Sequence, residues 1–321
     1  MVNLVQALGI VALLYCTSVA GDKVFRFDYT SSRNIDGWWK LHNIPVTWNM
    51  ARLRCLAEGA ILLSPLNKNY VKTMKMIMAT SNGSIQRGIY SGVHATYSKG
   101  VYSSIEGVPL SRIPVSWAPG EPDNYDNNES CLLFFPNGTM ADVNCNEVRP
   151  YICYKKRNYD VVRSDCGTTD SQYHLESRTG SCYKFHTIGQ TWHQAYMTCA
   201  AEGGYLAIIN NDIEAQALKE LAAKYPETRE IAKFTNFTDP VAVGYYDWNK
   251  DRTWFTIHGE SLSEAGYRIW SENQPDNAKI ENMGQHCGGM LRSSLLDDVW
   301  CEDLTYQFIC EKSPESLIPE A

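Results

Sequence analysis

The stretch Trp117-Ala-Pro-Gly-Glu-Pro-Asp-Asn124 shows how this chain is divided, because it returns 153 residues later as Trp270-Ser-Glu-Asn-Gln-Pro-Asp-Asn277. Other landmarks recur around it in the same order. They are Thr47-Trp48, Cys55, Ala57-Glu58-Gly59, Cys131 and Cys145 in the first copy, and Thr191-Trp192, Cys199, Ala201-Glu202-Gly203, Cys287 and Cys301 in the second. Self-similarity at this period, in a chain of 321 residues, predicts two tandem domains.

The positions of the two copies predict the boundaries. We expect a signal peptide over 1–20, a shorter domain over 21–157, a longer domain over 158–313 and a flexible tail over 314–321. The polar stretch from Lys155 to Asp165 is interpreted as the linker.

Each copy has the pattern of an α+β domain with two helices on small antiparallel sheets and long loops. Helical patterns cover 49–58 and 193–202, and each is followed by a glycine where a helix can stop. A second helix is expected in each copy, most clearly over 212–224, with Asn211 or Asp212 as its N-cap. Long loops in small domains are usually functional, so the search for a site begins there.

Several features predict a secreted protein. The apolar run from Leu8 to Tyr15, followed by Ser18-Val19-Ala20, is typical of a signal peptide and is shorter than the roughly 20 residues of a membrane span. Cys16 lies inside that signal, and the other ten cysteines form the even set expected of a disulfide-bonded extracellular protein. Glycosylation sequons agree with export and lie at Asn82, Asn128, Asn137 and Asn236.

Composition and motifs exclude some functions. The net charge of −7 argues against nucleic acid and anionic membranes as partners. Glu121 and Asp123 could suggest glycoside hydrolysis, but they lie two residues apart on one loop and not on opposite sides of a cleft. The chain has no His-Glu-x-x-His or Gly-x-Ser-x-Gly motif. We therefore expect a binding protein and not an enzyme.

The repeat favours one disulfide pairing, although sequence alone does not fix connectivity. The favoured pairs are Cys55–Cys153, Cys131–Cys145, Cys199–Cys310 and Cys287–Cys301, which leaves Cys166–Cys182. The last pair would close a hairpin in the second copy only. Trp38 stands at the position of Cys182 in the first copy, so packing must hold that hairpin.

With these features the sequence resembles the C-type lectin superfamily, and in particular the two-domain insect plasma lectins called immulectins. The resemblance rests on the cysteine framework, the two Trp-to-Asn stretches, and the Asp-Val-x-Cys segments that end at Cys145 and Cys301. It implies calcium as cofactor and cis peptide bonds before Pro122 and Pro275. It also implies a pattern-recognition role in haemolymph, with microbial carbohydrate such as lipopolysaccharide as ligand. Haemocyte surfaces or prophenoloxidase-cascade proteins are further implied partners.

The resemblance also assigns metal ligands. Calcium takes about 6–8 oxygen ligands. In the first copy they would come from Glu121, Asp123, Glu129 and Asp142, while Ala141 stands where the family has Asn. In the second copy they would come from Gln274, Asp276, Gln285, Asp297 and Asp298, where Gln285 replaces the family's Glu and Asp297 its Asn. A glycan at Asn128 would sit beside Glu129.

Sugar binding adds a further requirement. In the family, two neighbouring hydroxyls reach the ion, and each must donate one hydrogen bond and accept another. A carboxylate only accepts whereas an amide can donate, so each hydroxyl needs one acid and one amide. The carbohydrate-binding pairs would be Gln274 with Asp276 and Gln285 with Asp297 in the second copy, against Glu121 with Asp123 and Glu129 with Ala141 in the first.

Only the second copy meets this requirement, so we expect the second domain to be the better sugar binder. Two alternatives stay open: a solvated acidic loop without an ion, and a calcium-independent protein-binding domain on the same fold.

Overall fold

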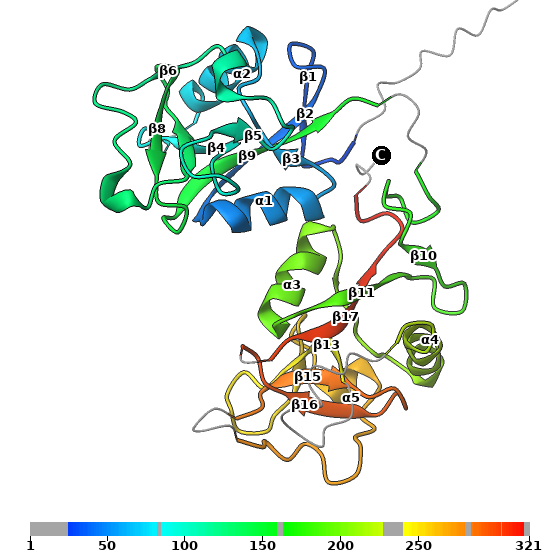
Figure 1. The fold of residues 1–321 in the computed structure, drawn as a ribbon. Helices are drawn as coiled ribbons and strands as arrows, with labels where there is room; N and C mark the ends of the chain where they lie inside the picture. Colours follow the sequence, from blue (N-terminus) through cyan, green and yellow to red (C-terminus); the bar gives the residue numbers. More distant parts are fainter. Residues whose placement is uncertain are drawn as a thin grey trace, which may run out of the picture.

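The computed structural model describes residues 25–81, 85–158, 163–226, 240–279, 284–302 and 304–317. Two α+β domains follow one another along the chain, which confirms the expected fold class (Figure 1). The signal peptide over 1–20 and the sequons at Asn82 and Asn236 lie outside the described residues.

Domain 1 is built around a nine-stranded sheet with the order β1-β2-β9-β4-β7-β8-β6, to which β3 and β5 add at β9 and β4. Its elements are β1 (Thr30–Ser32), β2 (Gly37–Val46), α1 (Trp48–Ala57), β3 (Ile61–Leu62), α2 (Lys68–Ala79), β4 (Ile89–His94), β5 (Ser103–Ser104), η1 (Leu110–Arg112), β6 (Ser116–Trp117), η2 (Tyr125–Asn127), β7 (Cys131–Phe134), β8 (Thr139–Val143) and β9 (Arg149–Lys156).

Domain 2 repeats this plan with an eight-stranded sheet, ordered β10-β11-β17-β13-β15-β16, with β12 on β17 and β14 on β13. Its elements are β10 (His174–Leu175), β11 (Cys182–Gln190), α3 (Trp192–Ala201), β12 (Tyr205–Leu206), α4 (Asp212–Ala222), β13 (Val241–Tyr246), β14 (Phe255–Thr256), α5 (Leu262–Ala265), β15 (Cys287–Met290), β16 (Leu296–Val299) and β17 (Tyr306–Lys312).

Capping side chains set the helix starts. The hydroxyls of Thr47 and Thr191 accept hydrogen bonds from backbone amides in the first turns of α1 and α3, which satisfies donors that a helix N-terminus leaves unpaired. Asn67 and Asn211 do the same for α2 and α4. The prediction of Asn211 as a cap is therefore confirmed, and α4 ends at Ala222, two residues earlier than expected.

The sheets are not purely antiparallel, which corrects one expectation. β4 runs parallel to β9, and β13 runs parallel to β17 at the equivalent place. β6 also pairs with β8 in parallel. Strand direction within a sheet depends on how distant segments come together, so local alternation of apolar residues does not reveal it.

Five disulfides link the elements, and they are the four pairs that the repeat favours together with the pair left over, Cys166–Cys182. They are Cys55–Cys153, Cys131–Cys145, Cys166–Cys182, Cys199–Cys310 and Cys287–Cys301. Trp38 pairs with Lys155 across β2 and β9, in the same register as Cys182 with Lys312 across β11 and β17. The buried Trp38 ring packs on Phe25 and so holds the first hairpin without a disulfide.

Two segments differ from the expected linker and tail. Lys155 and Lys156 belong to β9, so the connection between the domains starts later than the polar composition suggested. Residues 314–317 are packed against domain 2, because Leu317 is buried and the Ser316 hydroxyl donates to the Gly203 carbonyl at 2.7 Å. Gly203 permits this contact, since a Cβ there would lie 2.3 Å from Leu317.

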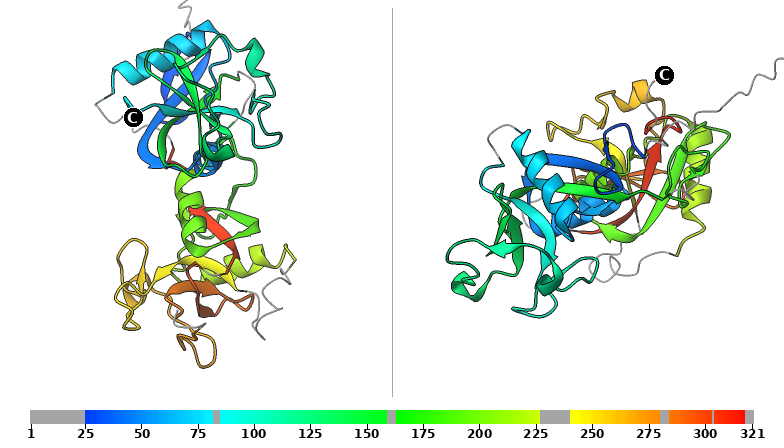
Figure 2. Two further views of the ribbon diagram at one scale, coloured as in Figure 1. Left: turned by 60° about the vertical axis from the view of Figure 1, so that its left-hand side comes forward. Right: turned by 90° about the horizontal axis from the view of Figure 1, so that it is seen from above.

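The domains meet where α1 faces α3 (Figures 1 and 2). Arg26 and Arg54 of domain 1 donate from their Nη1 atoms to the carbonyl oxygens of Ala201 and Met197, at 2.7 and 3.3 Å. These carbonyls lie in the second half of α3, where cationic donors interact favourably with the helix dipole. Among the described residues no helix is long and apolar enough to cross a membrane.

Candidate functional site

The loop around Pro275 brings together residues from three segments of domain 2. The Gln274–Pro275 peptide bond is cis, as expected, and the bond before Pro122 in domain 1 is cis too. Gln285 lies two residues before Cys287 of β15, while Asp297 and Asp298 lie on β16. Because β15 and β16 pair with each other, the later ligand candidates are placed beside one another under the loop.

Hydrogen bonds tie this loop to the acidic side chains. The Asp298 carboxylate accepts from the backbone N–H groups of Asp276 and Asn277, at 3.3 and 2.8 Å. The Ala278 N–H donates to both Asp276 Oδ1 and Gln285 Oε1, each at 2.9 Å. Gln274 Oε1 accepts from the Asp276 N–H at 2.8 Å. Four of the five predicted ligands therefore belong to one hydrogen-bonded group.

Domain 1 repeats the hydrogen bonds to Asp298 and from the Ala278 N–H. Asp142 accepts from the N–H groups of Asp123 and Asn124, at 3.3 and 3.2 Å, as Asp298 does in domain 2. The Tyr125 N–H donates to Asp123 Oδ1 and Glu129 Oε2, at 3.2 and 2.8 Å, as the Ala278 N–H does. The common network is set by backbone geometry, so it survives the replacement of Glu129 by Gln285.

The carboxylates of domain 1 lie close enough to share a cation. One oxygen from each of Glu121, Asp123 and Asp142 lies within 4.8 Å of the others. Burial, together with interactions with Asp142 and Asp123, raises the pKa of Glu121 to about 7. Burial and the same two neighbours raise the pKa of Glu129 as well, although its hydrogen bond from Tyr125 acts in the opposite direction. Crowded acids of this kind destabilise one another unless a proton or a cation is present.

Asp297, the fifth predicted ligand of domain 2, interacts with its acidic neighbours through charge. Burial, with the charges of Asp298 and Asp276, raises the pKa of Asp297 to about 7. Burial and the charge of Asp276 also raise the pKa of Asp298, despite the donors on its oxygens. The charges of Asp276 and Asp298 therefore act on Asp297, the one predicted ligand of domain 2 that lies outside the hydrogen-bonded group.

The two candidate pairs of domain 2 differ in exposure. Asp276 is exposed and Gln274 half-buried, whereas Gln285 and Asp297 are buried beneath the loop. Gln285 Nε2 and Asp297 Oδ1 are buried without a hydrogen-bond partner in the described part of the chain, and so is Asn277 Oδ1. In domain 1, Glu121 Oε2 is a buried atom without a hydrogen-bond partner in the described part of the chain. Unpartnered buried polar atoms are costly, which is typical of a site whose ligand is missing.

Ala141 is buried in β8 opposite Leu133 of β7, so its methyl group takes the place that the Asp297 carboxylate has in domain 2.

One residue was missed by the sequence analysis: Tyr102, whose hydroxyl donates to Asp142 at 2.9 Å. No local motif marks it, because it reaches the site through tertiary contact. The exposed Asn128 flanks Glu129 as expected, and Asn137 lies exposed at the turn between β7 and β8.

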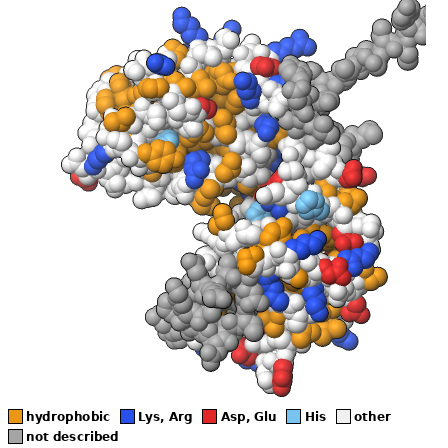
Figure 3. Space-filling model, turned by 45° about the vertical axis from the view of Figure 1, so that its right-hand side comes forward, with side chains coloured by type: hydrophobic (Ala, Val, Ile, Leu, Met, Phe, Trp, Pro, Cys, Tyr) orange, Lys and Arg blue, Asp and Glu red, His pale blue; other side chains and the backbone are white. Residues whose placement is uncertain are grey.

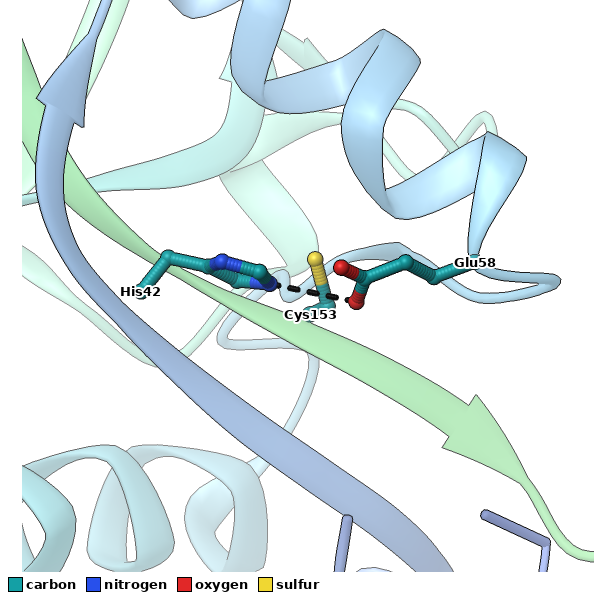
Figure 4. A group of neighbouring side chains, drawn as sticks. All are labelled: His42, Glu58 and Cys153. Carbon is teal, nitrogen blue, oxygen red and sulfur yellow. Dashed lines mark hydrogen bonds and ion pairs between the residues drawn. The ribbon is translucent and has the colours of Figure 1, made fainter. Parts of the chain in front are cut away.

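A second group of potential metal ligands has a structural explanation. His42 Nε2 lies 3.1 Å from Glu58 Oε2, beside Cys153 (Figure 4). Cys153 is bonded to Cys55, so it offers no thiolate to a metal. Burial would raise the pKa of Glu58, but the hydrogen bond and charge of His42 and the charge of Lys40 outweigh it and lower the pKa.

Domain 2 repeats this ion network at His186, Glu202 and Cys310, with Cys310 bonded to Cys199. Trp48 and Trp192 are buried in the cores, and Trp117 and Trp270 pack half-buried against them.

Comparisons with known proteins agree on one family. The family model described as "Lectin C-type domain" matches residues 44–155 and 188–312. The hemolymph lipopolysaccharide-binding protein of Periplaneta americana is 35% identical over 130 residues, which are 40% of this chain and 48% of that protein. CD209 antigen-like protein D of Mus musculus is 26% identical over 133 residues, covering 41% and 48%.

The C-type lectin domain-containing protein 161 of Caenorhabditis elegans is 22% identical over 300 residues, covering 86% of this chain and 32% of that protein. The matches thus span about half of these relatives or less. Among solved structures, the mouse scavenger receptor C-type lectin carbohydrate-recognition domain is 23% identical, with a TM-score of 0.36, and the match covers 44% of this chain and 96% of that one.

Proposed function

Since this chain belongs to the C-type lectin domain family, we propose that it is a secreted lectin that binds carbohydrate through calcium, mainly with domain 2. The observation that supports the proposal is the hydrogen-bonded group of Gln274, Asp276, Gln285 and Asp298, with the charges of Asp276 and Asp298 acting on the neighbouring Asp297.

The chemistry of this donor set fits calcium. Its members offer carboxylate and amide oxygens, which are the ligands that calcium takes. The unpartnered Asp297 Oδ1 in domain 2 and Glu121 Oε2 in domain 1 are buried acceptors that a cation would satisfy. When bound, calcium would supply coordination positions for neighbouring sugar hydroxyls.

The pairing of acids with amides supports domain 2 as the sugar binder. Gln274 and Asp276 flank Pro275 at the surface and give one hydroxyl a donor and an acceptor. Gln285 Nε2 and Asp297 Oδ1 are the unpartnered donor and acceptor of the second pair. Since both are buried, a sugar reaches them only if the segment 274–279 moves outward on binding.

Domain 1 has the carboxylates for calcium but no amide at the paired positions. Glu121 and Asp123 are both acids, and Glu129 is paired with the methyl group of Ala141. A hydroxyl placed there would find acceptors only. We infer that domain 1 binds calcium without binding sugar well. This departure also favours the runner-up function, a calcium-independent interaction with a protein.

The name of the cockroach relative suggests the kind of ligand, because that protein is called lipopolysaccharide-binding. We propose that this chain recognises microbial surface glycans as part of innate immunity in haemolymph. Haemocytes or prophenoloxidase-cascade proteins would then receive the signal. We propose binding and not catalysis, because Glu121 and Asp123 lie two residues apart on one loop and not on opposite sides of a cleft.

A solid-phase assay tests this proposal. The full chain is passed over neutral monosaccharide resins, in calcium and in EDTA. We expect binding in calcium, release by EDTA, and loss of most binding in Asp276→Ala. The matched control is Asp123→Ala in domain 1, which should retain binding. No retention on sugar resin in either calcium or EDTA would favour the protein-binding alternative.

A further inference from the structure

The net charge of −7 is the sum of opposite formal charges on the two domains and on the remaining residues. Residues 25–157 contain 15 Lys and Arg against 10 Asp and Glu, which gives a formal charge of +5. Residues 158–313 contain 13 Lys and Arg against 23 Asp and Glu, which gives −10. The exclusion of anionic partners, which rested on the net charge, therefore does not hold for domain 1 taken alone.

The Asp and Glu residues of domain 1 are not spread evenly among its Lys and Arg residues. Half of them lie in the candidate calcium loop or on β8 beside it: Glu121, Asp123, Asp126, Glu129 and Asp142. Of the other five, Asp28, Asp36, Glu58 and Glu147 already pair with cations, and Glu106 accepts from Ser64. The remaining surface of domain 1 is therefore strongly basic.

Helix α2 concentrates this charge. Lys68, Lys72 and Lys75 are exposed at i, i+4 and i+7, and no Asp or Glu occurs in α2. With a rise of about 1.5 Å per residue, successive lysines lie about 6 and 4.5 Å apart along one face. Among the described residues none of the three pairs with an acid, and Lys75 Nζ donates to the Asn137 carbonyl at 3.0 Å.

The equivalent helix of domain 2 has the opposite composition. Asp212, Glu214 and Glu220 lie on α4, with Lys219 as its one basic residue. Glu214 is buried and Glu220 pairs with Arg178, so α4 does not present a matching row of free carboxylates. A second copy of this chain is therefore a poor occupant for the lysine face of α2.

The lysine face is accessible in the assembled chain. α2 lies on the side of domain 1 away from domain 2, whereas α1 forms the contact between the domains (Figures 1 and 2). In Figure 3, Lys and Arg side chains stand out from the upper domain with few acidic side chains among them. On the opposite face of α2, Thr73, Met74, Ile77 and Met78 are buried and anchor the helix.

We propose that the lysine face of α2, defined by Lys68, Lys72 and Lys75, binds the phosphate or carboxylate groups of an anionic glycan independently of calcium. A row of ammonium groups attracts spaced anions without requiring hydroxyl geometry. The other exposed residues of α2 are Asn69, Met76 and Ala79, so the face offers no aromatic ring on which a nucleic-acid base could stack.

The inference goes beyond the proposed function, because it assigns a ligand to the domain that lacks sugar-specific amides. One chain would then recognise two features of a surface polymer. Domain 2 would bind its sugar hydroxyls, and domain 1 would bind its anionic groups. Two linked sites on one polymer raise avidity without a new contact.

The test uses the full chain in EDTA, so that the calcium site does not contribute. Dextran phosphate and neutral dextran of equal length are immobilised as probes. We expect binding to dextran phosphate only, and a loss of roughly tenfold or more between 50 and 200 mM salt, since about three charge contacts are involved. The variant Lys68→Gln/Lys72→Gln/Lys75→Gln should lose affinity roughly tenfold.

The matched control removes three exposed lysines from domain 2, as Lys219→Gln/Lys224→Gln/Lys250→Gln. It should change affinity less than twofold. The proposal is overturned by equal binding of the two dextrans, by unchanged affinity of the α2 variant, or by no binding to dextran phosphate. Tighter binding to single-stranded DNA, or self-association at low salt that the α2 variant abolishes, would assign the face to another occupant.

Discussion

Glu311 should make domain 2 less stable as pH rises. Its side chain is 2% exposed, and it accepts hydrogen bonds from Ser181 Oγ, Tyr205 OH and the Ile208 N–H, at 2.8, 3.0 and 3.2 Å. Burial and the charge of Glu214 nevertheless raise its pKa to about 7. In domain 1 the equivalent position holds Tyr154, whose hydroxyl donates to the Ile35 carbonyl at 2.6 Å.

The direction in which the free energy of unfolding changes with pH follows from the raised pKa of Glu311. The folded domain binds a proton at Glu311 more tightly than the unfolded chain does, so the protonated side chain contributes stability fully below a pH of about 4.5. This contribution is lost as pH rises through about 7. Between pH 8 and pH 5.5 the shift corresponds to about 2 kcal/mol of unfolding free energy.

Glu311→Gln removes the titrating group and keeps its shape. The amide oxygen still accepts from the Ile208 N–H, and its NH₂ group can donate to the hydroxyl oxygens of Ser181 or Tyr205. We expect the variant to be more stable than the wild type at pH 8, by up to about 2 kcal/mol, and to have a flatter pH profile. Urea unfolding at both pH values measures this, with the exposed Glu260→Gln as control. A variant with lower stability at pH 8 and an unchanged pH slope would refute the reasoning.

Three further predictions concern sugar binding by domain 1, the disulfide of the second hairpin and the contact between the domains. Glu121→Gln/Ala141→Asn gives each pair in domain 1 one acid and one amide, so calcium-dependent retention on sugar resin should appear in an Asp276→Ala background; continued absence would count against the pairing rule. Cys166→Ser/Cys182→Ser opens a loop of 16 residues and should lower unfolding free energy by about 3 kcal/mol in denaturant titrations, while an unchanged midpoint would contradict this. Arg26→Ala/Arg54→Ala removes both donors to α3 and should speed proteolytic cleavage between the domains, whereas Arg33→Ala should not.

The two-domain plan and the cysteine pairs could be predicted from sequence because they depend on recurrence. Cys131 and Cys145 keep the spacing of Cys287 and Cys301, and this spacing is visible without a structure. Helix starts could be predicted for a similar reason, since the cap at Asn211 acts within its own first turn. The candidate ligands came from motif positions, and four of those in domain 2, Gln274, Asp276, Gln285 and Asp298, belong to one hydrogen-bonded group.

Other features depend on contacts between distant segments and could not be predicted. Tyr102 reaches Asp142 across 40 residues, and no local pattern indicates this contact. The parallel pairing of β4 with β9 follows from how the sheet closes, not from the residues of either strand. Leu317 is buried because Gly203 leaves room for it, so the start of the tail that composition describes as flexible is packed, while residues 318–321 lie outside the described residues.

The most direct test of the lectin account is a crystal structure of the chain grown with calcium and a bound sugar. We predict one ion in domain 2, held by oxygens of Gln274, Asp276, Gln285, Asp297 and Asp298, with two neighbouring hydroxyls of the sugar on the same ion. A sugar bound elsewhere, with no ion among these five side chains, would contradict it.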